Sequence, residues 1–131
     1  MNWLKIVTFG LTGRRKAQLI ITFKGTKVRR IFDLKEDSIN IFREEKYNPK
    51  NIEDCVIKEG NNIYIANFSP FSNISREPVK LRWNQKIGKY LLWNETKTPV
   101  FVEGKPLQAS GQHLNNTDHI QIGPMQVQII Y

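Results

Sequence analysis

The chain has 131 residues, of which 40% are apolar and 11% aromatic, so it is long and apolar enough to fold as one domain around one core. The single cysteine, Cys55, excludes an internal disulfide, and no cysteines and histidines have the spacing of a zinc site. Twenty lysines and arginines against twelve acidic residues give a net charge of +8, which favours an anionic partner such as nucleic acid, a phosphoprotein, an acidic protein surface or a membrane surface. We therefore expect a cytoplasmic protein that binds no metal and no other cofactor.

The N-terminal stretch MNWLKIVTFGLTGRRKAQL does not have the order of a targeting signal. Lys5 interrupts its apolar run, its basic residues follow that run, and no small-residue cleavage site is evident. We predict that it begins with a strand. No later stretch is apolar for long enough to span a bilayer.

From residue 17 onward, apolar and polar residues alternate with the period of two that is typical of half-buried strands. The segments LIITF (19–23) and VRRIF (28–32) flank KGTK, which predicts a hairpin. In residues 35–51, Asp37 and Ser38 are candidate helix caps and Pro49 is a stop signal, so we expect at most one short helix there.

The rest of the chain continues as short strands separated by turn-forming loops. VKLRW (79–83) and KYLLWN (89–94) flank the turn NQKIG and predict a second hairpin. We expect Trp83 and Trp93 to pack in the core. The remaining predicted strands lie in residues 54–57, 61–68, 99–107, 119–123 and 125–131. This spacing predicts an all-β fold, an antiparallel β-sandwich, in a single domain that spans residues 1–131.

The second half of the chain resembles the forkhead-associated (FHA) domain, a β-sandwich family of FHA/SMAD-like fold whose typical members bind phosphothreonine peptides through loops at one end. Four stretches carry the resemblance: SREPVKL (75–81), KYLLWN (89–94), TKTPVFVEGKPL (96–107) and LNNTDHIQIG (114–123). VIKEGNNIYI (56–65) matches the family's glycine-arginine turn and next strand with a gap of one residue. The family-like core is thus residues 55–131, and residues 1–54 supply opening strands and an extension.

The resemblance implies a binding site for a phosphopeptide or another protein segment at one end of the sandwich. It places Ser75 at the serine that contacts phosphate, and Arg76 follows that serine as it often does in the family. Asn62 falls at the usual aspartate position, and Thr98 falls where the family has the asparagine that grips the peptide main chain.

Other positions depart from the family's binding pattern. The family arginine falls at Lys58 and Glu59, where the glutamate repels phosphate. An alternative placement at Arg43 leaves residues 44–74 before Ser75, a separation that we consider too long unless an inserted helix carries Arg43 to the pocket. Pro78 and Pro99 replace the family's histidine and glycine. We therefore expect phosphothreonine recognition to be weakened or lost.

Our leading hypothesis is a noncatalytic protein–protein interaction module that acts as an adaptor in a larger assembly, through the loops at residues 58–62, 69–78 and 94–99. The sequence has no nucleophile elbow, phosphate-cradling glycine loop or catalytic acid pair, so we do not expect an enzyme. His113 and His119 have no candidate catalytic partner in the sequence, and we expect both on loop surface.

Two alternatives remain. The first is a basic nucleic-acid-binding β domain, in which a stripe near the first hairpin contacts phosphate. The stripe comprises Arg14, Arg15, Lys16, Lys27, Arg29 and Arg30. These charges equally suit an edge strand that is kept soluble by its cations. The second alternative is a membrane-surface or secretion-apparatus subunit that is tethered by MNWLKIVTF.

Overall fold

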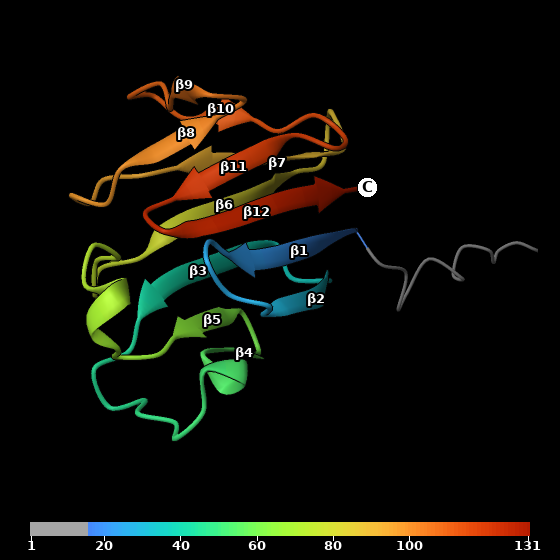
Figure 1. Ribbon diagram of the computed structural model, residues 1–131. Coiled ribbons are helices and arrows are strands. Elements are labelled where there is room, and N and C mark those ends of the chain that lie inside the picture. The colour runs from blue at the N-terminus through green and yellow to red at the C-terminus, as the bar shows by residue number, and fades with distance from the viewer. Residues whose placement is uncertain (1–15) are drawn as a thin grey trace, which may run out of the picture.

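The computed structural model describes residues 16–131, which form two six-stranded β-sheets that share one hydrophobic core (Figure 1). The first sheet has the order β2-β1-β12-β11-β8-β9 and the second has the order β10-β7-β6-β3-β5-β4. The first sheet contains β1 (Ala17–Phe23), β2 (Arg29–Leu34), β8 (Val100–Val102), β9 (Lys105–Pro106), β11 (His119–Ile122) and β12 (Met125–Ile130). The second contains β3 (Ser38–Arg43), β4 (Val56–Glu59), β5 (Asn62–Ile65), β6 (Val79–Asn84), β7 (Lys89–Trp93) and β10 (Gln112–His113). The predicted all-β sandwich is confirmed.

The alternation seen in the sequence decides which side chains fill the space between the sheets. In β1, AQLIITF, every second side chain is buried, and β12 buries Met125, Val127 and Ile129 in the same way. Each such aliphatic side chain stabilises the fold by about 1.5–3 kcal/mol through removal of its surface from water. β1 and β12 lie side by side and antiparallel, so the first and last strands of the described chain pair in the interior of the first sheet (Figure 1).

Both predicted hairpins form. β1 pairs with β2 in antiparallel register, with Leu19 opposite Phe32, and β6 pairs with β7, with Leu81 opposite Leu92. The turn between β6 and β7 ends at Gly88, whose φ of 67° lies in the left-handed region that glycine adopts without strain.

Residues 35–51, where we expected at most one short helix, contain none. Residues 38–43 form β3, which lies between β5 and β6 in the second sheet. Ile39 and Ile41 are buried while Asn40 between them faces outward, a period of two that no helix accommodates. The main-chain carbonyl of Asp37, a candidate helix cap, instead accepts a hydrogen bond from the N–H of Trp83.

One strand pair departs from the predicted antiparallel order. β3 and β5 run parallel, with Arg43 opposite Ile65. Parallel neighbours need a crossover connection, and here it is made of residues 44–61, which carry a single-turn 3₁₀ helix, η1 (Ile52–Asp54), and the edge strand β4. A second single-turn helix, η2 (Ser69–Phe71), lies in the loop after β5.

The two tryptophans of the second hairpin face opposite sides of the sheet. Trp83 packs against the core, with its ring 5.0 Å from that of Tyr90, as predicted. Trp93 does not: the flanking strand residue Leu92 is buried, so Trp93 lies on the outer face opposite Lys80. The prediction that Trp93 packs in the core was wrong.

Candidate binding site at the loop end of the sandwich

Arg43, the last residue of β3, is held at the end of the sandwich by three hydrogen bonds. Its main-chain N–H donates to the carbonyl of Ser75 at 3.0 Å. Its guanidinium donates through Nε to the carbonyl of Ile74 at 2.9 Å and through Nη1 to Oδ1 of Asn67 at 2.7 Å. These bonds fix the guanidinium plane and leave Nη2 without a hydrogen-bond partner in residues 16–131. A fixed guanidinium with a free donor suits a carboxylate or phosphate.

Ser75 lies next to Arg43, in the loop that enters β6. Its main-chain N–H donates to Oγ1 of Thr98 at 2.7 Å, and its Oγ accepts the N–H of Glu77 at 3.0 Å. The hydroxyl proton remains available to a ligand because Oγ acts only as an acceptor in these contacts. The side chain is partly exposed.

Arg76 brings a second guanidinium to this end of the molecule. Its Nη1 is 3.1 Å from Oε2 of Glu45, and both side chains are more than 60% exposed (62% and 65%). An ion pair with this exposure contributes about 0–1 kcal/mol, so a ligand anion can displace Glu45 at small cost. The carbonyl of Glu45 accepts a hydrogen bond from Nδ2 of Asn67, the amide that also holds Arg43. We call Arg43, Ser75 and Arg76 the loop-end cluster.

Thr98 lies beneath this cluster and not at its surface. It is 2% exposed, and its hydroxyl oxygen accepts a hydrogen bond from the N–H of Ser75. Asn94 closes the loop that contains Thr98 by donating to its carbonyl at 2.8 Å and accepting the N–H of Thr96 at 2.9 Å. In this structure Thr98 supports the loop of Ser75 from below, and its role in gripping a peptide stays a prediction.

Asn62 and the pair Lys58–Glu59 lie away from the loop-end cluster. Asn62 begins β5 and accepts a hydrogen bond from Asn40, roughly 10 Å of strand from the end at which Arg43 lies. Lys58 pairs with Glu36 at 2.9 Å. Of the two placements considered for the family arginine, Arg43 lies beside Ser75, whereas Lys58 pairs with Glu36.

The sequence did not point to Asn67 or Glu45, and it left Arg43 as a less favoured alternative because of the long separation from Ser75. The separation is filled by η1, β4, β5 and η2, and Arg43 itself ends strand β3. The useful signal was the segment SINIFR, whose strand alternation ends at an arginine.

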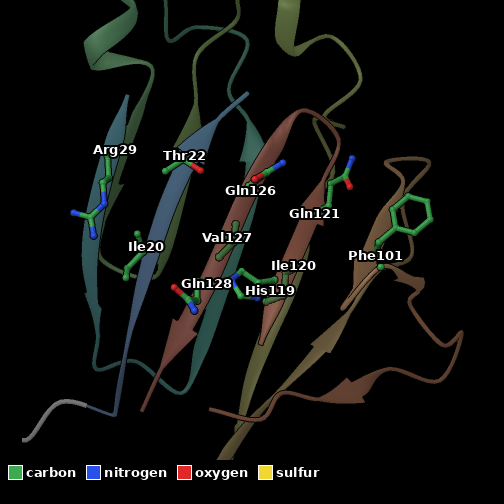
Figure 2. Close-up of a pocket in the computed structure, with 11 residues that line it drawn as sticks. Ile20, Thr22, Arg29, Phe101, His119, Ile120, Gln121, Gln126, Val127 and Gln128 are labelled. Atoms are coloured by element: carbon green, nitrogen blue, oxygen red, sulfur yellow. The ribbon is translucent and has the colours of Figure 1, made fainter. Parts of the chain in front are cut away.

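Among the described members of the predicted basic stripe, Arg29 and Arg30 point to opposite faces of the first sheet. Arg14 and Arg15 lie outside the described residues, and Lys27 is exposed in a turn. Arg29 lies on the outer face of the first sheet (Figure 2), whereas Arg30 donates through Nη2 to the carbonyl of Glu53.

An open pocket with a volume of about 500 Å³ lies on the outer face of the first sheet. Figure 2 shows that amide and apolar side chains line it, with Arg29 at one side and Phe101 at the other. His119 lies here at the start of β11, with Nδ1 3.2 Å from Glu103, and not in a loop; His113, in β10, is exposed beside Asn84. This surface is separate from the loop-end cluster, with which it shares no residue.

Several other chemistries find no support in the part of the chain that is described. Residues 16–131 contain no cluster of three histidine, cysteine or acidic side chains that is placed to hold a metal ion. Cys55 is fully buried, and burial raises the pKa of its thiol to about 11, so it stays protonated at neutral pH. The helices within 16–131 are single turns, and none has the length or apolar character of a membrane span. The proposed tether at residues 1–9 lies outside the described residues.

The fold matches those of solved FHA domains. The FHA domain of the CT664 protein from Chlamydia trachomatis superposes with a TM-score of 0.59 at 17% identity, over 90% of this chain and 98% of that one. The FHA structure of Rv0020c superposes with a TM-score of 0.57 at 18% identity, over 91% of this chain and 97% of that one. The FhaA FHA domain in complex with the intracellular domain of Rv3910 superposes with a TM-score of 0.55 at 18% identity, over 86% of this chain and 98% of that one. No family model and no curated sequence matches the chain. The chain has an FHA-like fold.

Proposed function

We propose that this protein is a noncatalytic interaction module, an adaptor that binds an anionic segment of a protein partner at the loop-end cluster. One observation carries the proposal: the fold brings Arg43 and Ser75 together from distant parts of the chain, and Arg76 follows directly. The FhaA FHA domain, which has a similar fold, was solved in complex with a protein partner.

The cluster has the donors that an anion needs. Nη2 of Arg43 and the hydroxyl of Ser75 are unused donors at neighbouring positions, and Arg76 adds a cation whose present partner is exposed. Charge-assisted hydrogen bonds of this kind contribute about 1.5–3 kcal/mol each. Two or three of them are enough to hold an acidic or phosphorylated segment at the end of the sandwich.

Selectivity for phosphothreonine is weakened in this proposal. Thr98 is buried, and Pro78 and Pro99 have no main-chain N–H to donate. Each charge-assisted contact that is missing lowers affinity by about one to two decades. The cluster therefore binds anionic segments with phosphate as a contributor and not as a requirement.

The test compares a degenerate phosphothreonine peptide library with its unphosphorylated twin, each fluorescently labelled, by anisotropy. The proposal predicts binding of both, with the phosphorylated library less than about tenfold tighter. Arg76→Ala and Arg43→Lys weaken both. The matched control, Arg29→Ala, removes one exposed charge from the other sheet and leaves both unchanged. Absence of binding, or equal losses in Arg29→Ala and Arg76→Ala, contradicts the proposal.

A further inference from the structure

Trp93 lies on the outer face of the second sheet with two cations over its ring. The ammonium nitrogen of Lys80 is 5.7 Å from the ring centroid, and the guanidinium carbon of Arg82 is 5.9 Å from it. Lys80 is directly opposite Trp93 on the neighbouring strand, and Arg82 is the next outward residue along β6. Because these residues face away from the core, the ring and both charges are accessible from one side of the sheet.

Two more rings lie on the same face, on strands β3 and β5. The rings of Phe42 and Tyr64 meet edge to face with their centroids 5.2 Å apart, and both side chains are partly exposed. Between Phe42 and Trp93 lie two strand spacings and one pleat repeat, which separate the two positions by roughly 12 Å, and Tyr64 lies one strand further away. Phe42, Tyr64, Lys80, Arg82 and Trp93 form what we call the aromatic-basic face.

The charge of the aromatic-basic face is not neutralised by neighbouring carboxylates. Lys80 and Arg82 form no ion pair within residues 16–131. From Lys80, the row of residues across the sheet runs through Asn40 and Asn62 and reaches a carboxylate only at Glu59, on the edge strand β4. The face thus presents cations and rings together, with amides between them.

We propose that the aromatic-basic face binds single-stranded nucleic acid. Unpaired bases stack on aromatic rings whatever their sequence, and cations beside the rings contact the phosphates. A duplex does not satisfy this surface, because its bases are already stacked and an open sheet face does not enter its grooves as a helix does. This site uses none of the residues of the loop-end cluster and none of the residues of the first-hairpin stripe.

A labelled oligo(dT) of about 16 nucleotides, a length at the upper end of known single-strand site sizes, is titrated with the full chain at several salt concentrations. Binding is predicted to weaken as salt rises. In Lys80→Ala/Arg82→Ala the slope of log K against log salt falls by about 1.4, which is about 0.7 for each phosphate contact. The control Lys27→Ala/Arg29→Ala, which removes two charges from the first hairpin, keeps the slope.

Substitution of Trp93 separates stacking from simple charge attraction. Trp93→Leu is predicted to weaken binding about fivefold or more and to abolish the tryptophan quenching caused by oligo(dT), while Trp93→Phe retains most of the affinity. Thermal melts of each variant show that the fold is retained. Undiminished binding by Trp93→Leu, equal affinity for duplex DNA, equal slope changes in both double variants, or no binding overturns the proposal. Peptide binding by the same variants reports on the loop-end cluster separately and is predicted to be unchanged.

Discussion

The N–H of Arg43 donates to the carbonyl of Ser75 at 3.0 Å, although residues 44–74 separate the two along the chain. The bond joins the end of the central strand β3 to the loop that enters β6. It therefore brings together a guanidinium and a hydroxyl that the sequence presents as unrelated.

The carboxylate of Glu45 competes with any ligand anion for Arg76, because the two side chains form an exposed ion pair at 3.1 Å. Glu45→Gln is expected to raise the affinity for an acidic or phosphorylated peptide roughly twofold to fivefold, with the larger gain at low salt. Anisotropy titrations at two salt concentrations measure this. Unchanged or lower affinity shows that Arg76 does not contact the peptide.

The hydroxyl of Thr98 is a buried acceptor for the N–H of Ser75 at 2.7 Å. Thr98→Val keeps the shape and removes the acceptor, so it is expected to lower the free energy of unfolding by about 1–3 kcal/mol and to weaken peptide binding. Urea unfolding gives the first value. Thr22→Val, on the outer face of the first sheet, is the control and is expected to stay within about 0.5 kcal/mol of wild type. Equal effects of the two substitutions contradict the supporting role of Thr98.

Tyr90 is fully buried, and its hydroxyl donates to the carbonyl of Glu36 at 2.6 Å. Burial, together with the nearby charge of Glu36, raises the pKa of Tyr90. The folded state therefore keeps the proton that the unfolded chain releases near pH 10. The contribution of Tyr90 to the free energy of unfolding is complete below about pH 10 and declines at higher pH.

Tyr90→Phe is expected to lower the free energy of unfolding by about 0.5–1.5 kcal/mol at neutral pH, from the lost hydrogen bond. The difference between wild type and variant is expected to shrink above about pH 10, because only wild type has this ionisation. Urea unfolding at neutral and alkaline pH measures both. A difference that is constant across this range contradicts the assignment.

Cys55 is fully buried and has a raised pKa of about 11, caused chiefly by burial. A thiol reagent is expected to modify Cys55 very slowly in the native protein and rapidly in denaturant. Unfolding exposes the sulfur and removes the burial that raises its pKa, so more of the thiol is ionised. Absorbance of the released chromophore follows the reaction. Fast native modification shows that the segment around η1 does not pack as described.

The predicted strands and hairpins follow from residues whose neighbours along the chain settle the structure. VKLRW and KYLLWN alternate regularly around a tight turn, and the C-terminal segment MQVQII does the same, so local pattern and final structure agree. The resemblance to FHA domains rested on the spacing of turns and strands in residues 75–123. This spacing is a local property of the chain, and the folded structure keeps it.

The features that the sequence did not settle are the outward side of Trp93, the strand within residues 35–51 and the position of Arg43. Each depends on contacts between distant segments. In KYLLW both possible faces are apolar, and only the pairing with β6 decides that Tyr90 and Leu92 point inward and Trp93 outward. Residues 35–51 combine helix caps with a short alternation, and the pairing of β3 with both β5 and β6 selects the strand. We favoured Lys58–Glu59 for the family arginine because the hairpin β4–β5 looks locally like a strand and turn of the family, and only the contact between Arg43 and Ser75 brings Arg43 to the loop end.

A ¹H–¹⁵N correlation spectrum recorded during titration with an acidic or phosphothreonine peptide shows whether the loop end of the sandwich receives an anionic partner segment. We expect shifts concentrated at Arg43, at residues 66–78 and at residues 94–99. Shifts confined to the outer face of either sheet, or none at saturating peptide, contradict it.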